Sequence, residues 1–179
     1  MSIDPTNSLT LIAARGNVIY KSKENFGEWD NIYTNPENSS IVSVKIDSYD
    51  PNRYFAATQN GQLIVSLDGG ATWSNRYQFG EEIKKIYQSD QDTRVLYAVT
   101  DKGLYKSTDA GEGWEKLTDN LKNFKNAKKI HQLFIDPNNF SHIYLATDYG
   151  LLESKDGGLS FIPINTLVPF GKLPIKVLA

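Results

Sequence analysis

An eight-residue pattern, Ser-x-Asp-x-Gly-x-x-aromatic, recurs along this chain and constrains its fold more than any other sequence feature. The clean copies are Ser66–Trp73, Ser107–Trp114 and Ser154–Phe161. A degenerate copy stands at Ser22–Trp29, with Glu24 in place of Asp and Phe26 in place of Gly. Neighbouring copies begin 41 to 47 residues apart. A fixed period of this length indicates repetition of one supersecondary unit.

Each copy stands at the end of a larger repeated unit, and the segments upstream of the copies are similar to one another. The apolar runs upstream, typical of strands, are Leu11–Ala14, Tyr54–Thr58, Leu96–Thr100 and Ile143–Thr147. The polar turns that follow, typical of hairpins, are Gln59–Gly61, Asp101–Gly103 and Asp148–Gly150. The Ile-x-x-(Val/Ile/Leu) segments further upstream are Ile41–Val44, Ile83–Ile86 and Ile130–Leu133. Asp-Pro turns follow at Asp50 and Asp136.

These features predict four short antiparallel strands in each unit: an inner strand, a second strand, a hairpin to the third, then the pattern and the outer strand. Four such strands in about 40 to 50 residues is the period of a propeller blade. We therefore expect an all-β protein, a β-propeller with four blades per chain. The expected blades are residues 2–36 with 173–179, then 37–79, 80–121 and 126–166. A turn or two of helix is expected only in residues 118–129.

The residue types of the pattern suit a structural role. Its Asp can accept hydrogen bonds from backbone N–H groups of the turn, as in Asx turns. Its Gly can adopt positive φ, and its aromatic residue can pack over the turn. The residues expected to act in this way are Ser66, Asp68, Gly70, Trp73, Ser107, Asp109, Gly111, Trp114, Ser154, Asp156, Gly158 and Phe161.

The two ends of the chain fit one unit. Ser2–Pro5 corresponds to the end of an inner strand and its Asp-Pro turn, and Leu173–Ala179 carries the Ile-x-x-Leu of another inner strand. We expect Ile175–Ala179 to pair beside Leu9–Ala14 and complete the first blade, a closure that removes exposed strand edges. One chain can close a four-bladed ring in this way, or two chains can exchange strands in an eight-bladed homodimer.

Composition narrows the function classes. The net charge of −2 and the pI of about 5.7 give no general attraction to nucleic acid or to an anionic membrane. The absence of cysteine excludes disulfides and thiolate metal sites. With His131 and His142 as the only histidines, we expect no metal site and no cofactor. No apolar run is long enough to span a bilayer, and Met1–Pro5 does not resemble a signal peptide, so location is open; an extracellular or periplasmic location would fit if a signal was removed.

The clean copies resemble the Asp-box (BNR) repeats of sialidases, xyloglucanase-type glycosidases, sortilin-like receptors and photosystem II assembly-factor-like proteins. The resemblance covers nearly the whole chain and implies a propeller. Flat Asp-box blades generally occur in larger rings, which favours the dimer. The resemblance does not choose a function, because these families include hydrolases, receptors and assembly factors.

The resemblance implies two possible kinds of catalytic site. A sialidase-like site resembles three arginines that grip one carboxylate. Of the four arginines Arg15 is expected in a hairpin, whereas Arg53 and Arg94 lie at the opposite rim, so convergence is not expected. A xyloglucanase-like site needs two facing carboxylates, for which Asp101 and Asp148 are the candidates, although Asp is also favoured in tight hairpins.

The rim that gathers the hairpins and the linkers between blades is the candidate binding surface. Its expected residues are Arg15, Asn17, Gln59, Asn60, Asp101, Lys102, Asp148 and Tyr149 from hairpins, and Tyr33, Arg76, Tyr77, Phe79, Phe124 and Phe170 from linkers. Aromatic and mixed polar groups match the composition of interaction hot spots. Packing of some of these aromatics between blades is the alternative.

Two further features have simpler interpretations. The lysines of Lys122–Lys129 fit a solvated linker better than a nucleic-acid site, and His131 is expected on an inner strand, facing the central channel. We therefore predict a non-catalytic scaffold that binds a protein, or a glycan, through one rim, or a self-assembling half-ring. The alternative is half of a xyloglucanase-like glycoside hydrolase.

Overall fold

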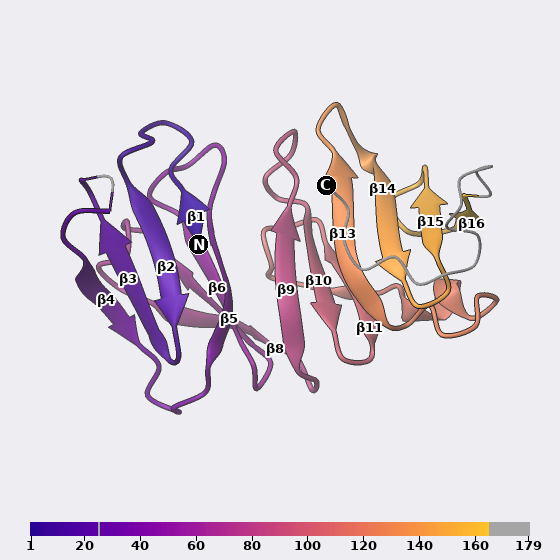
Figure 1. Ribbon diagram of the computed structural model, residues 1–179, viewed down its shortest axis with the longest axis horizontal. Helices are drawn as coiled ribbons and strands as arrows, with labels where there is room; N and C mark the ends of the chain where they lie inside the picture. The colour runs from indigo at the N-terminus through magenta and orange to yellow at the C-terminus, as the bar shows by residue number, and fades with distance from the viewer. Residues whose placement is uncertain (25, 165–179) are drawn as a thin grey trace.

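The computed structural model describes residues 1–24 and 26–164 (Figure 1). In this part of the chain the strands form four four-stranded antiparallel sheets, each in chain order. Blade 1 contains β1 (Ser2–Ile3), β2 (Leu11–Arg15), β3 (Val18–Ser22) and β4 (Asp30–Thr34). Blade 2 contains β5 (Ile41–Ile46), β6 (Tyr54–Thr58), β7 (Gln62–Ser66) and β8 (Ser74–Gln78). Blade 3 contains β9 (Ile83–Gln88), β10 (Leu96–Thr100), β11 (Gly103–Ser107) and β12 (Glu115–Lys116). Blade 4 contains β13 (Ile130–Asp136), β14 (Asn139–Thr147), β15 (Leu151–Ser154) and β16 (Ile162–Pro163).

The sheets confirm the expected fold class of four antiparallel blades. A single 3-10 helix, Thr118–Leu121, lies in the linker between blades 3 and 4 among the residues described. The expected pairing of residues 173–179 with blade 1 lies outside the described residues. None of the described helices is long and apolar enough to cross a membrane.

Apolar clusters fill the spaces between consecutive blades. Side chains alternate along a strand, so β6 sends Tyr54 and Ala56 into a cluster with blade 1, and Phe55 and Ala57 into a cluster with blade 3. Both faces of the middle blades are therefore buried. This double burial explains why their second strands read as continuous apolar runs instead of alternating ones.

The four inner strands face one another around a common centre. Figure 1 shows β1, β5, β9 and β13 on the inner side of their blades, with β4 and β16 at the two far sides. A hollow of about 330 Å³ lies between them, lined by residues of all four inner strands. This hollow therefore lies on the inner side of the four blades.

The three clean copies of the eight-residue pattern, called clean boxes below, each stabilise their own turn through their polar side chains. In blade 2 the Ser66 Oγ accepts the N–H of Gly70 at 2.8 Å, and Asp68 Oδ1 accepts the N–H of Thr72 at 2.8 Å. The indole Nε1 of Trp73 donates to the Gly70 carbonyl at 3.2 Å. The bonds to serine and aspartate recur in blades 3 and 4. The box is thus a self-satisfied turn, as its residue types predict.

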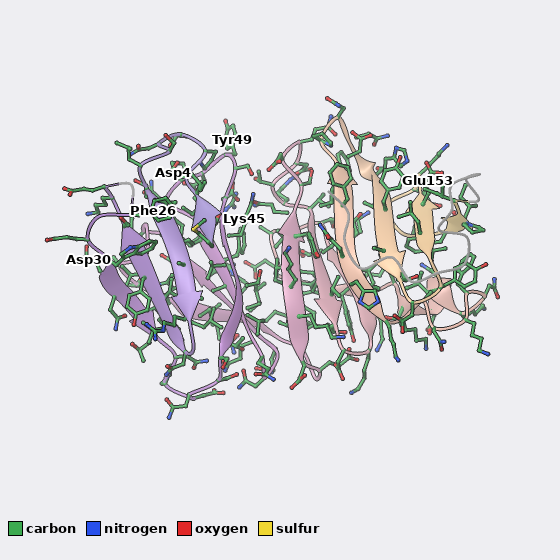
Figure 2. The ribbon with its side chains drawn as sticks, viewed as in Figure 1. Asp4, Phe26, Asp30, Lys45, Tyr49 and Glu153 are labelled. Atoms are coloured by element: carbon green, nitrogen blue, oxygen red, sulfur yellow. The ribbon has the colours of Figure 1, made fainter. Side chains whose placement is uncertain are left out.

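The boxes also bring each blade close to the one before it. A Cβ added to Gly70 would lie 2.7 Å from Ile32 of blade 1, and one added to Gly111 would lie 2.6 Å from Leu63 of blade 2. Blade 1 carries Phe26 at the same position of its degenerate box, with a φ of 72° and a side chain that is 53% exposed (Figure 2). The glycine is therefore required by contact between blades, and the box of blade 1 departs from this rule.

Candidate functional site

The two rims of the propeller differ in their chemistry. At one rim, here called the box rim, each clean box is bonded to the second strand of its blade or to the turn that precedes this strand. The backbone bonds are Gly69 N–H to Asn52 O, Ala110 N–H to Arg94 O, and Gly157 N–H to Ser141 O, at 2.6 to 2.9 Å. Because box polar groups are engaged in turn formation, this rim offers few free groups to a ligand.

The opposite rim, here called the hairpin rim, is made of the hairpins and the linkers between blades. The backbone bonds that join them are Gln59 N–H to Ser40 O, Asp101 N–H to Glu82 O, and Asp148 N–H to Lys129 O, at 2.7 to 3.1 Å. The structure thus brings the hairpin residues singled out from the sequence to one side of the molecule. Which of them are available to a ligand depends on their side-chain contacts.

Several hairpin side chains already serve the rim itself. Asn60 and Gln62 both donate to the carboxylate of Glu37 at 2.7 Å. Gln59 donates to Glu82 at 3.1 Å, and Asn17 donates to a linker asparagine at 3.0 Å. These side chains, which include the candidates Asn17, Gln59 and Asn60, hold linkers in place. The side chains of Arg15 and Lys102 are exposed.

The hairpin of blade 4 and the linker before it form the most concentrated group of side chains on this rim. Asp148 Oδ1 lies 2.6 Å from His131 Nε2, and Asp148 Oδ2 lies 3.5 Å from Lys129 Nζ. Phe124 of the linker meets Tyr149 of the hairpin edge-on, with ring centroids 5.2 Å apart. We call these five residues the rim patch: Phe124, Lys129, His131, Asp148 and Tyr149.

The electrostatics of the rim patch keep Asp148 ionised. The hydrogen bond with His131, and the nearby charge of Lys129, lower the pKa of the Asp148 carboxyl. His131 was expected to face the central channel, and this expectation is wrong. Strand β13 has an irregularity between Ile130 and Gln132 that leaves His131 without a cross-strand partner in β14, so its side chain reaches the rim.

The candidate binding residues that were expected in linkers do not all lie in linkers. Tyr33, Arg76 and Tyr77 are within outer strands β4 and β8. Tyr77 packs edge-on against Phe79 at 4.8 Å, and Phe79 is only 3% exposed, so both belong to the core between blades 2 and 3. Phe170 lies outside the described residues. Of the linker aromatics, Phe124 is the one that takes part in the rim patch.

Three arginines lie around one hollow at the box rim, although no convergence of arginines was expected from the sequence. Arg53, Arg76 and Arg94 line one hollow of about 490 Å³. The expectation failed because Arg76 stands in β8 and reaches the box of blade 3, instead of lying in a linker at the hairpin rim.

Each of these arginines already has an acidic partner. The ion pairs are Arg53 with Asp47 at 2.8 Å, Arg94 with Asp92 at 2.9 Å, and Arg76 with Glu112. A ligand carboxylate would have to displace one of these protein carboxylates, so the hollow does not resemble a preformed anion-binding site. In the part of the chain that the structure describes, no three His, Cys, Asp or Glu residues are grouped as metal ligands.

Comparisons with known proteins show which family this chain resembles. The family model described as "Sortilin, neurotensin receptor 3" matches residues 17–158. The vacuolar protein sorting/targeting protein PEP1 of Saccharomyces cerevisiae is 29% identical over 79 residues, which are 42% of this chain and 5% of PEP1. This chain is therefore similar to a small part of that much longer protein.

Two solved structures share the fold at low sequence identity. The GH74 xyloglucanase from Xanthomonas campestris has a TM-score of 0.74 and 17% identity, over 93% of this chain and 30% of the enzyme. YCF48 bound to D1 peptide has a TM-score of 0.54 and 13% identity, over 92% of this chain and 80% of YCF48. The repeated boxes, the four-stranded blades and the family match agree, and the chain belongs to the sortilin (Vps10) family of Asp-box β-propellers.

Proposed function

We propose that this chain is a non-catalytic protein-interaction module that binds its partner through the hairpin rim, with the rim patch at the centre of the contact. The family match supports a role in protein interaction or sorting, since it covers most of the chain and PEP1 is named for vacuolar protein sorting. The structural neighbour YCF48, solved with a D1 peptide, supports peptide binding by propellers of this shape.

The observation that carries the proposal is the composition and geometry of the rim patch. It combines an aromatic pair, Phe124 and Tyr149, with the charged group around Asp148. Interfaces concentrate their binding energy in aromatic residues surrounded by polar groups. The hydrogen bond between His131 and Asp148 holds the charged group in place before a partner arrives, which reduces the entropy lost on binding.

A glycosidase of xyloglucanase type is the second candidate, and the geometry disfavours it. Such an enzyme needs one carboxylic acid whose pKa is raised, so that it can protonate the leaving oxygen. Asp148 has a lowered pKa and an engaged carboxylate, which leaves Asp101 alone as a potential acid. We expect no release of reducing sugar from xyloglucan. Release that is abolished by Asp148→Asn would establish the enzyme instead.

The binding proposal is tested with peptides selected from a displayed library against the immobilised chain. Tyr149→Ala and Phe124→Ala are each expected to weaken peptide binding about tenfold or more, which corresponds to about 1.4 kcal/mol. The matched control is Tyr49→Ala, because Tyr49 is an 85% exposed tyrosine in the turn between β5 and β6, on the box rim (Figure 2). Loss of binding in the Tyr49 variant, with binding retained in the rim-patch variants, would contradict the proposal.

A further inference from the structure

The linker between blades 3 and 4 is longer than the other linkers between blades. It contains the thirteen residues 117–129, whereas residues 35–40 join blades 1 and 2, and residues 79–82 join blades 2 and 3. The longer linker reaches the hairpin rim, where Lys129 O accepts the N–H of Asp148 and Phe124 packs against Tyr149. In repeat proteins an insertion in one repeat commonly lies on the binding face. The composition of this linker therefore bears on what the rim binds.

The linker is basic although the protein as a whole is acidic. Residues 117–129 carry four lysines and one aspartate, which gives them a net charge of +3. The whole chain has a net charge of −2, so the remaining residues together carry −5. The positive charge at this part of the hairpin rim is therefore local and does not reflect a general basic character of the molecule.

Three lysines of this linker, Lys122, Lys125 and Lys128, are here called the linker lysines. All three are exposed, while Leu121 and Ala127 between them are fully buried and hold the segment to the core. In the part of the chain that the structure describes, none of the three ammonium groups forms an ion pair or a hydrogen bond. Their charges are therefore available to a partner.

Other lysines are engaged by the protein itself. Lys116 Nζ lies 2.9 Å from the carboxylate of Glu81, and Lys21 Nζ donates to Gly69 O at 2.9 Å. These contacts join an outer strand to a linker in the first case and two neighbouring blades in the second. The linker lysines make no such contact among the described residues, so folding does not account for their charge.

The acidic group of the rim patch does not cancel this charge. Asp148 Oδ1 lies 2.6 Å from His131 Nε2, and Asp148 Oδ2 lies 3.5 Å from Lys129 Nζ. Both oxygens of this carboxylate therefore face groups of the protein. The aromatic pair of the rim patch includes Phe124, which stands between two linker lysines in the sequence. An apolar contact surface with positive charge on both sides along the chain is the result.

We propose that the hairpin rim binds an acidic peptide, in which an apolar or aromatic side chain contacts Phe124 and Tyr149 and flanking carboxylates contact the linker lysines. This inference rests on the proposed function, because it names the class of partner for the same rim patch. Complementary charge speeds association and excludes partners of the wrong charge. The exposed lysines therefore act mainly on the association rate, and the aromatic pair acts mainly on the lifetime of the complex.

Nucleic acid is a less suitable partner for the same lysines. Domains that bind nucleic acid commonly have a pI above about 9, with basic residues spread along one face. The pI of this chain is about 5.7. A polyanion that extends beyond the linker would meet the excess of negative charge on the remaining residues. A short acidic peptide needs the linker alone.

The partner class is tested with peptides selected from a displayed library of random short sequences against the immobilised chain. Those peptides whose binding is weakened by Tyr149→Ala are expected to be enriched in Asp and Glu relative to the unselected library. In the tightest of them, replacement of every Asp by Asn and every Glu by Gln keeps the length and removes the charge. This replacement should weaken binding about fivefold or more, because several exposed ion pairs are lost together.

Association kinetics test the lysines themselves. The double variant Lys122→Gln, Lys125→Gln should lower the association rate constant of the acidic peptide about fivefold and change its dissociation rate constant little. The matched control is Lys23→Gln with Lys155→Gln, which removes two charges from exposed lysines in the boxes of blades 1 and 4. The control should change the association rate constant less than about twofold. Added salt should slow association to the native chain more than association to the linker variant.

The outcomes separate this inference from the proposed function. Selected peptides that depend on Tyr149 but are neither acidic nor sensitive to the Lys122, Lys125 variant would overturn the acidic partner and leave the proposed function intact. Peptides that bind without dependence on Phe124 or Tyr149, or a failure to select any peptide, would contradict the proposed function as well. Tighter binding of a single-stranded thymidine oligonucleotide than of the acidic peptides, lost in the same lysine variant, would identify a nucleic-acid site instead.

Discussion

At the scale of single residues, the aspartates of the clean Asp boxes have lowered pKa values, and the effect is large for Asp68 and Asp156. Hydrogen bonds from the hydroxyl and N–H of Thr72 and from Ser66 lower the pKa of Asp68 to about 2. Burial alone would raise the pKa of Asp156, but hydrogen bonds from Ser160 and Ser154 outweigh it and bring the value to about 2. Both carboxylates are therefore more acidic in the folded chain than in an unfolded one, where the value is about 3.9.

This difference predicts a loss of stability in acid. A carboxyl group whose pKa is lowered by folding stabilises the protein above its unfolded pKa, and that contribution disappears as the pH falls through the folded pKa. The free energy of unfolding, measured with urea, should therefore decline between about pH 4 and pH 2. The double variant Asp68→Asn, Asp156→Asn should show a shallower decline. An equally steep decline in the double variant would show that other groups control the acid sensitivity.

Gly111 offers a separate test of the contact between blades. Its φ of 88° and the 2.6 Å approach of an added Cβ to Leu63 predict that Gly111→Ala costs about 2 kcal/mol or more of unfolding free energy. Gly80→Ala is the control, because Gly80 has open space around its Cβ direction. Equal stability of the two variants in urea unfolding would contradict the packing described here.

At Phe26, in the degenerate box of blade 1, we expect a glycine substitution to stabilise the protein. Phe26 adopts a left-handed φ of 72°, which costs a residue with a Cβ about 1 kcal/mol. Its half-exposed ring lies beside that of Trp29, with ring centroids 6.1 Å apart. Phe26→Gly should therefore raise the free energy of unfolding by about 1 kcal/mol, whereas Phe26→Ala, which keeps the Cβ, should not. Destabilisation by the glycine variant would indicate that the ring is held in a contact important for folding.

At the scale of the elements, the linker between blades 3 and 4 alternates anchors with solvent-facing lysines. Leu121 and Ala127 are fully buried, while the lysines at 122, 125, 128 and 129 are exposed. This pattern agrees with the solvated linker expected from the sequence. The anchors fix the segment that carries Phe124 to the rim patch.

Removing one anchor should disturb both stability and the rim. Leu121→Ala is expected to cost about 2 to 5 kcal/mol of unfolding free energy, because it leaves a cavity in the cluster between blades 3 and 4. Lys122→Ala should be close to neutral. Thermal unfolding of the two variants side by side checks this, and a neutral Leu121 variant would mean that the linker is not held by the core.

The sequence predicted the strand order and the turns because these depend on local chemistry. The box at Ser107–Trp114 and the hairpin at Asp101–Gly103 carry their own glycine and aspartate signals. It misplaced His131 and Arg76, because an irregularity in strand pairing changes which way a side chain points and is not marked by any residue type. The rim patch could be predicted only in part, since the contact between Phe124 and Tyr149 depends on tertiary packing.

At the scale of the whole molecule, the two rims of the four blades differ in how many of their polar groups already have a partner within the protein. At the box rim the polar groups form the turns and ion pairs of the protein itself. At the hairpin rim an aromatic pair and a charged group lie on hairpins and linkers that are held by hydrogen bonds. Binding residues are commonly found on loops that a rigid scaffold positions. Under the proposed function, the box rim contributes mainly to stability and the hairpin rim to recognition.

Hydrogen exchange of the chain with and without a selected peptide tests this division most directly. We predict that the peptide slows exchange in residues 124–131 and 147–150, and leaves the box turns at residues 67–72 and 108–113 unchanged. Slower exchange in the box turns, with no change in the hairpin and linker of blade 4, would contradict the account.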